Sequence, residues 1–324
     1  MRPLRDRLTV TPAQYRRVAY VTLAALSVIV LTGAAVRLTG SGLGCPNWPK
    51  CYGGPLPPLS THALIEFGNR ALSGLVGVLT VVAFVLAATR KPYRRDLLVL
   101  ALLLPLGVVA QAVLGGFTVR EHLAPGFVMA HFSLSMVILI AAVALAWRAR
   151  YEPGARPLSD ERAGVWGVRA LAPLAALTIV AGTAATAAGP HAGGSPGQRI
   201  HRLTFKGPET LMWVVHQHAT IAAVFGVTVI AVWFWLRRRG AGDELLEPLT
   251  ILGVLLAAQG LVGSVQYELH LPTDMVWVHV ALATATWLVV LWAVAAAGRL
   301  TPARAPAAAT DAPVAPREFE VVGP

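Results

Sequence analysis

The sequence predicts an all-α integral membrane protein with eight transmembrane helices, arranged as two pseudo-repeated four-helix bundles with both termini cytoplasmic. Hydrophobic residues make up 56% of the chain and charged residues 13%, whereas soluble domains carry about 25% charged residues. Eight apolar runs can be placed, each of roughly the 20 residues that a helix needs to cross about 30 Å of hydrocarbon. A long internal repeat divides the eight runs into two sets of four.

The apolar runs define the expected spans. They lie near residues 18–38, 63–88, 97–117, 126–147, 166–188, 210–236, 247–265 and 275–297. The first run follows five arginines, and no small-residue cleavage site clearly follows it. We therefore expect a retained span and not a signal peptide.

The internal repeat relates residues 111–131, QAVLGGFTVREHLAPGFVMAH, to residues 259–279, QGLVGSVQYELHLPTDMVWVH. In both copies a Gly follows the Gln by four residues, a polar hairpin contains His-Leu, and a second His lies twenty residues after the Gln. Each copy belongs to a set of four spans, an even number, so the two copies are expected to be parallel. The predicted units are a basic cytoplasmic arm 1–17, a first half 18–148, a cytoplasmic linker 149–165, a second half 166–298 and a disordered cytoplasmic tail 299–324.

The net charge of +11 is distributed as a membrane topology and not as a nucleic-acid surface. Of the 27 Lys and Arg, 20 fall in the segments 1–17, 90–95, 148–169, 237–239 and 299–317. These segments alternate with the loops 39–62, 118–125, 189–209 and 266–274, as the positive-inside rule requires. We expect the second set of loops to face outward, and we expect contact with membrane lipid and no nucleic-acid partner.

The chain's only cysteines, Cys45 and Cys51, lie in the first outer loop. In an oxidising compartment so close a pair favours a structural disulfide. A redox-active pair is the main alternative, while a zinc site is disfavoured because no His or further Cys lies nearby.

Three polar residues stand at i, i+3 and i+4 near the start of the second span, and therefore share one face of the helix: Glu66, Asn69 and Arg70. An interfacial Glu–Arg pair is the simpler interpretation. Because both ionisable groups lie one to two turns inside the apolar run, we favour a functional role.

The sixth span contains two histidines, His216 and His218, about 200° apart around the helix axis. Only one of them can face the bundle interior. Aligning Gly226 with Gly77 places His218 on Asn69, so we expect His218 to point inward.

All nine histidines fall in outer loops or in the outer thirds of spans. His131, His218, His279 and Asn69 lie at similar depth and form one layer. In the second half His218 and His279 come from different helices, as axial ligation of a haem iron by two imidazoles requires. In the first half the equivalent pair is His131 and Asn69. Since an amide is a poor iron ligand, we expect a porphyrin there with an open or weakly held position, as suits a substrate.

The features that carry a family resemblance are the eight spans, the repeat, the loop GCPNWPKC, the segment IEFGNR, His131, His218 and His279. With these features the chain resembles the haem A synthase family, in its bacterial eight-helix form. The resemblance covers about residues 18–298. It implies an oxidoreductase of the cell (plasma) membrane that converts the C8 methyl of haem O to a formyl group by successive hydroxylations, making haem A for aa3-type terminal oxidases. It further implies a haem b cofactor between His218 and His279, a required Glu66 and a disulfide between Cys45 and Cys51.

One position departs from the family, because many members have a histidine where this chain has Asn69. The hypothesis is then that His131 anchors the substrate iron, that Glu66 accepts a proton or positions water, and that Arg70 or Arg120 contacts propionates. Haem O synthase and an electron-transfer protein are expected partners, with homo-oligomerisation left open. The alternatives are a bis-His b-type electron-transfer cytochrome and a repeat-built transporter, both disfavoured because all the ligands lie in one outer layer.

Overall fold

The computed structural model describes residues 9–155, 158–159, 161–195 and 197–300. Its eight long helices are all long and apolar enough to cross a membrane. They are α2 (Pro12–Leu38), α3 (Thr61–Thr89), α4 (Arg95–Arg120), α5 (Pro125–Arg150), α6 (Arg162–Ala188), α7 (Thr210–Arg238), α8 (Asp243–Glu268) and α9 (Thr273–Ala296). A 3-10 turn η1 (Gly207–Glu209) precedes α7, and β1 (Leu158–Ser159) pairs in parallel with β2 (Arg299–Leu300). The prediction of an all-α membrane protein with eight spans is confirmed.

Most helices extend beyond the apolar runs by several residues at one or both ends, because hydropathy detects only the part of a helix that lies in hydrocarbon. The first helix is the clearest case. The Thr11 hydroxyl accepts from the Gln14 N–H at 3.3 Å, and the Gln14 side chain accepts from the Thr11 N–H at 2.9 Å. This capping box starts α2 at Pro12, within the basic stretch that precedes the first apolar run.

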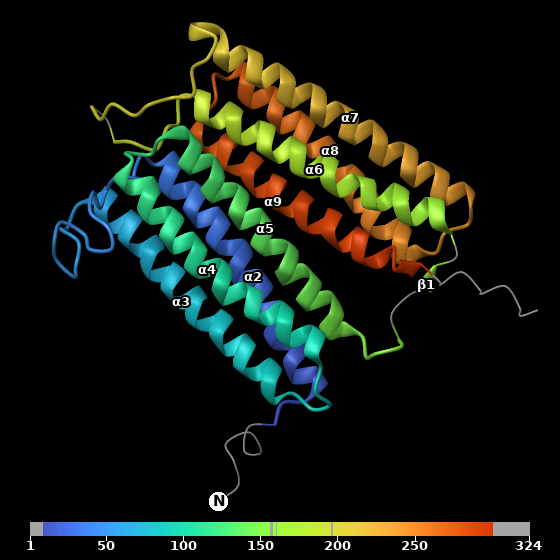
Figure 1. Cartoon of the computed structure of the whole chain (residues 1–324). Coiled ribbons are helices and arrows are strands. Elements are labelled where there is room, and N and C mark those ends of the chain that lie inside the picture. The colour runs from blue at the N-terminus through green and yellow to red at the C-terminus, as the bar shows by residue number, and fades with distance from the viewer. Residues whose placement is uncertain (1–8, 156–157, 160, 196, 301–324) are drawn as a thin grey trace, which may run out of the picture.

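The helices form two bundles (Figure 1). In the first, α2, α3, α4 and α5 pack in a ring, each against its neighbours in sequence and α2 against α5. In the second, α6, α7, α8 and α9 pack in the same order, with α6 against α9. The bundles meet where α5 and α2 pack against α9, and α5 packs against α6. The expected pair of pseudo-repeated four-helix bundles is therefore present.

The repeat extends to the backbone of the two hairpins that follow α4 and α8. His122 and Leu123 between α4 and α5 have φ of 50° and 61°, and His270 and Leu271 between α8 and α9 have φ of 62° and 64°. In each hairpin the leucine N–H donates to the carbonyl five residues earlier, at 2.8 and 2.7 Å. Non-glycine residues adopt this left-handed conformation rarely, so its occurrence at equivalent positions shows that both hairpins are built alike.

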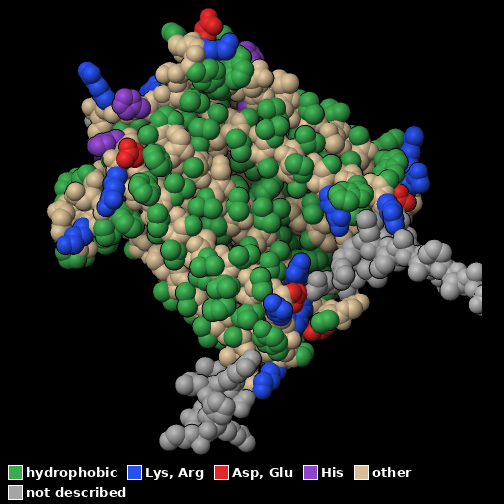
Figure 2. All heavy atoms as spheres, viewed as in Figure 1, with side chains coloured by type: hydrophobic (Ala, Val, Ile, Leu, Met, Phe, Trp, Pro, Cys, Tyr) green, Lys and Arg blue, Asp and Glu red, His purple; other side chains and the backbone are tan. Residues whose placement is uncertain are grey.

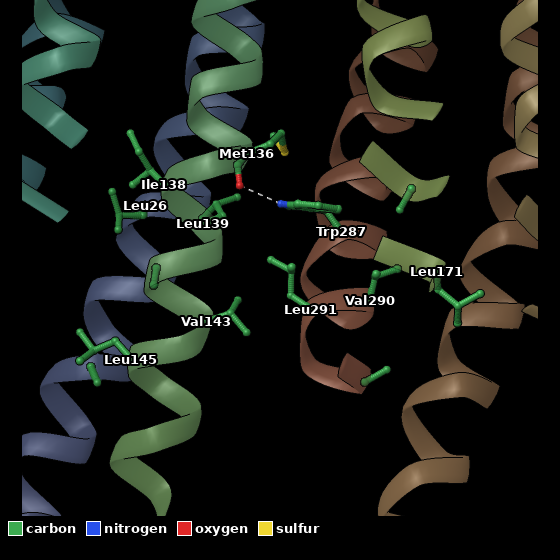
Figure 3. Close-up of a cluster of buried hydrophobic side chains, with 14 of the residues drawn as sticks. Leu26, Met136, Ile138, Leu139, Val143, Leu145, Leu171, Trp287, Val290 and Leu291 are labelled. Atoms are coloured by element: carbon green, nitrogen blue, oxygen red, sulfur yellow. Dashed lines mark hydrogen bonds between the residues drawn. The ribbon is translucent and has the colours of Figure 1, made fainter. Parts of the chain in front are cut away.

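Helix α9 joins the two halves through tryptophan side chains. Trp287 Nε1 donates to the Met136 carbonyl of α5 at 2.9 Å, within a cluster that includes Leu139 and Leu291 (Figure 3). Trp277 Nε1 donates to the Leu31 carbonyl of α2 at 3.1 Å. An indole N–H is a single donor, so each tryptophan bonds one carbonyl. Trp287 thereby ties α9 to α5, and Trp277 ties α9 to α2.

The outward surface is apolar, with charged side chains gathered toward the two ends (Figure 2). Large side chains such as Leu75, Val227 and Leu261 are 65%, 67% and 67% exposed. In water an apolar surface of this extent would be unfavourable. It fits helices whose outer faces contact lipid.

Candidate functional site

In the second half, His218 of α7 and His279 of α9 face each other. Their ring centroids lie 6.2 Å apart, with the ring planes at 71°. Both side chains are half-buried, whereas His216 is exposed. The structure thus turns His218 inward, as the alignment of the two halves predicted.

Hydrogen bonding and close packing orient the two rings. The Thr178 carbonyl of α6 accepts from Nδ1 of His218 at 3.0 Å, and a proton on Nδ1 leaves Nε2 of the neutral ring with its lone pair. A Cβ atom at Gly182 would lie 3.0 Å from Cε1 of His218, and one at Gly263 would lie 3.1 Å from Cε1 of His279. Each imidazole therefore packs against a glycine of the neighbouring helix with Cε1 nearest to it, and a larger residue there would displace the ring.

This arrangement fits two axial ligands of a haem iron. With metal–imidazole bonds of about 2.0–2.1 Å, a metal midway between two rings places their centroids roughly 6 Å apart. Within the described part of the chain, no cluster of three or more His, Cys, Asp or Glu could hold a metal ion, as a closed zinc site would require. Two opposed imidazoles with no third protein donor are the donor set of a bis-His haem.

The first half repeats this design with one imidazole. His131 of α5 lies against Gly115 of α4, where a Cβ atom would be 3.2 Å from Cε1. Asn69 of α3 aligns with His218 in the sequence repeat, and its Oδ1 accepts from the Thr32 hydroxyl of α2 at 2.8 Å. Among the described residues nothing bonds to the buried Nδ1 of His131. The two sites therefore share a framework and differ in their donors.

Glu66 lies beside the cysteine loop, residues 44–54. Its carboxylate is buried, with the residue 5% exposed, and Oε2 accepts from the Cys45 N–H at 2.7 Å. The hydrogen bond between Cys45 and Glu66 depends on the preceding residue, Gly44. A Cβ atom at Gly44 would lie 2.2 Å from the His62 carbonyl, so only glycine lets the loop come this close to the start of α3.

Arg70 holds the same loop. Its guanidinium pairs with Glu66 and donates to three loop carbonyls, those of Cys45 at 2.9 Å, Asn47 at 3.0 Å and Lys50 at 3.4 Å. The helical spacing of Glu66 and Arg70 predicted that they share a face, but it gave no indication of the loop contacts, which depend on the path of residues 44–54. Arg120, the other arginine considered, is exposed at the end of α4.

The cysteine pair forms a disulfide, with the Cα atoms of Cys45 and Cys51 4.7 Å apart. The expected disulfide is therefore confirmed. Between the cysteines, Trp48 packs against Gly116 of α4, where a Cβ atom would lie 2.9 Å from Cδ2 of the indole. Sequence reasoning missed Trp48. One sequence signal pointed to this contact: the second copy of the repeat has Ser264 where the first copy has Gly116, so a glycine is retained only in the half that has the cysteine loop.

Three further histidines, His62, His191 and His201, have separate surroundings. Nδ1 of His62 lies 3.0 Å from the Ser41 hydroxyl. Nε2 of His191 donates to the Leu271 carbonyl at 2.7 Å and so joins the loop after α6 to the hairpin before α9. His201 is exposed. None of these contacts brings a third imidazole to either candidate site.

The sequence matches a known protein family and several curated proteins. The model of the COX15-CtaA family, described as cytochrome oxidase assembly protein, matches residues 16–64 and 60–194. Heme A synthase of Bacillus mycoides (strain KBAB4) is 34% identical over 129 residues, which are 39% of this chain and 42% of that protein. Heme A synthases of Bacillus cereus (strain AH187) and Bacillus anthracis (strain A0248) are each 33% identical over the same lengths. The chain thus matches less than half the length of these curated relatives.

Proposed function

The chain belongs to the cytochrome oxidase assembly protein family, and from this premise we propose that it is a haem A synthase, an oxidoreductase that converts the C8 methyl of haem O to a formyl group and so supplies haem A for aa3-type terminal oxidases. The similar proteins are named Heme A synthase. The observation that carries the proposal is the difference between the halves. One presents two facing imidazoles. The other presents a single imidazole and, beside the cysteine loop, a buried carboxylate.

His218 and His279 are the proposed axial ligands of a haem b, which supplies one-electron transfer when bound. The Thr178 carbonyl keeps the lone pair of His218 on Nε2, and the facing glycines fix both rings. These features support a permanently held cofactor, because a ligand that is already oriented loses little freedom on binding.

In the first half His131 is the proposed anchor of the substrate iron. Asn69 provides no second strong ligand and is engaged with Thr32, which suits a porphyrin that must enter and leave. Glu66 is the proposed proton acceptor, or orients water, near the reacting methyl. Arg70 holds Glu66 and the cysteine loop in place, and this leaves the exposed Arg120 for the substrate propionates.

The protein is proposed to lie in the plasma membrane with both termini cytoplasmic and the site layer toward the outer face, because most Lys and Arg lie at the opposite ends of the spans. Haem O then arrives from haem O synthase, a membrane-borne partner, and an electron-transfer protein is the second proposed partner. Both the halves 18–148 and 166–298 are needed, the first for the substrate and the second for haem b.

The test is co-expression of the full chain with a source of haem O, followed by chromatographic identification of the extracted haems. Haem A is expected beside haem B. The Glu66→Gln variant is expected to retain haem b and to accumulate haem O or a hydroxylated intermediate, while the exposed control Glu121→Gln behaves as the parent. Haem B alone from the parent protein would instead identify an electron-transfer cytochrome, and normal haem A output from Glu66→Gln would remove Glu66 from the reaction.

A further inference from the structure

Two equivalent glutamines, Gln111 of α4 and Gln259 of α8, reach the helices that carry His131 and His279. The four residues repeat in register between the halves. Both imidazoles pack against a glycine, and a Cβ atom added there would lie 3.2 Å from Cε1 in the first half and 3.1 Å in the second. The hydrogen bonds of the two glutamines nevertheless differ.

In the second half the glutamine reaches the imidazole itself. With its amide turned to satisfy its hydrogen bonds, the Gln259 nitrogen donates to Nδ1 of His279 at 3.1 Å and to the His279 carbonyl at 3.2 Å. Its oxygen accepts from the Ala283 N–H at 2.9 Å. An amide carries both donors and an acceptor, so it can also turn its oxygen toward a protonated Nδ1 when Nε2 binds a metal. Gln259 is thus placed to orient the ring in either state.

In the first half a serine stands where the second half has Ala283. The Gln111 nitrogen donates to the Ser135 hydroxyl at 2.6 Å and to the His131 carbonyl at 2.9 Å. The hydroxyl in turn donates to the same carbonyl at 3.3 Å. Within the described chain, Gln111 Oε1 and His131 Nδ1 are both buried and both lack a hydrogen-bond partner.

We propose that Ser135 is a positioning residue that draws the Gln111 amide away from His131, so that the first-half imidazole is a less firmly oriented ligand than His279. Outer hydrogen bonds to a metal-binding imidazole fix its orientation and raise its basicity, and their loss typically weakens metal binding about 10–100-fold. The hydroxyl that distinguishes the halves at this position therefore adds to the effect of Asn69 in making the first-half haem easier to exchange. This inference rests on the proposed function for the identity of the two haems.

The test exchanges the two residues. Haem-free full-length protein in detergent is titrated with iron protoporphyrin, and the sites are read separately, because a bis-His iron is low-spin and an iron with one imidazole is high-spin. Ala283→Ser is expected to weaken binding at the low-spin site about tenfold or more, and Ser135→Ala to strengthen binding at the high-spin site by a similar factor. Low-spin electron paramagnetic resonance g-values should shift in Ala283→Ser alone.

Two further variants control for general effects on folding. Ser27→Ala removes another half-buried helical hydroxyl, which donates to the Leu23 carbonyl at 2.9 Å, and is expected to leave both affinities unchanged. Ser135→Thr keeps the hydroxyl and is expected to restore parental binding. Affinities of both exchange variants within twofold of the parent would overturn the inference while leaving the proposed function intact. If the two exchange variants showed the expected effects but the parent made no haem A, the proposed function alone would fail. If the parent bound iron protoporphyrin at neither site, both would be overturned.

Discussion

Arg70→Lys is the most informative single change, because it keeps the positive charge beside Glu66 and removes the guanidinium fork. Lysine presents one compact ammonium, whereas the arginine pairs with the carboxylate and reaches three carbonyls of the cysteine loop at once. The ammonium can hold Glu66 or one carbonyl but cannot bridge them all. The substitution therefore tests loop anchoring separately from charge.

The expected magnitude follows from the contacts. The bonds to the Cys45 and Asn47 carbonyls, at 2.9 and 3.0 Å, have good geometry, while the bond to Lys50 at 3.4 Å is weak. Hydrogen bonds to charged groups contribute about 1.5–3 kcal/mol each. The arginine side chain is 20% exposed, so we take the lower end and discount it for solvent, which gives about 2 kcal/mol for the two bonds. Loop opening should then become about 30-fold more frequent.

Hydrogen exchange of the backbone amides in residues 45–51, measured on the full-length protein in detergent, reports that opening directly. The Cys45 amide is the sharpest probe, since its N–H bonds to Glu66 at 2.7 Å. The matched control is Arg202→Lys in the second outer loop, where the arginine is exposed and makes one weak bond, to the Pro190 carbonyl at 3.4 Å. Exchange in Arg70→Lys within twofold of the parent would refute loop anchoring by the guanidinium.

Two other predictions concern neighbouring positions. His218→Ala is expected to abolish the low-spin haem spectrum, because it removes one of the two facing imidazoles. His216→Ala changes an exposed residue and should leave that spectrum intact. Loss of the spectrum in His216→Ala would show that His216, and not His218, is the ligand. Gly116→Ser copies the residue of the second half and places a Cβ atom 2.9 Å from the loop tryptophan. It should destabilise the packing of the loop by about 1–3 kcal/mol, which would be measured as faster exchange of the loop amides. Gly126→Ser meets open space and is the control, and equal exchange in the two variants would show that the tryptophan contact contributes nothing.

Much of the fold was predictable because a membrane imposes simple constraints. A span must be about 20 apolar residues long and its backbone must bond internally, so hydropathy alone located all eight helices. The repeat identified the two bundles and selected His218 over its neighbour, since equivalent residues must occupy equivalent places. Helix ends were missed by several residues, as at Pro12, where a capping box and not hydropathy sets the boundary.

The contacts of the cysteine loop were not predictable in the same way. Residues 44–54 have no periodicity, and their path depends on a close approach of Gly44 to α3. Hence the helical spacing indicated that Glu66 and Arg70 share a face, but not that both are committed to holding the loop. The packing of Trp48 on Gly116 likewise joins two segments far apart in the sequence.

The sequence by itself determined the number of spans, their division into two halves and the choice of His218 over His216 as the inward residue, because each follows from local hydropathy or from comparing one half with the other. Only the tertiary structure decided which partners the polar side chains take. The facing rings of His218 and His279, the loop carbonyls around Arg70 and the hydroxyl that binds Gln111 are each formed by helices or loops that meet only after folding. Hydrogen bonds have specific directions and short ranges, so their partners depend on packing that no periodicity in one chain records.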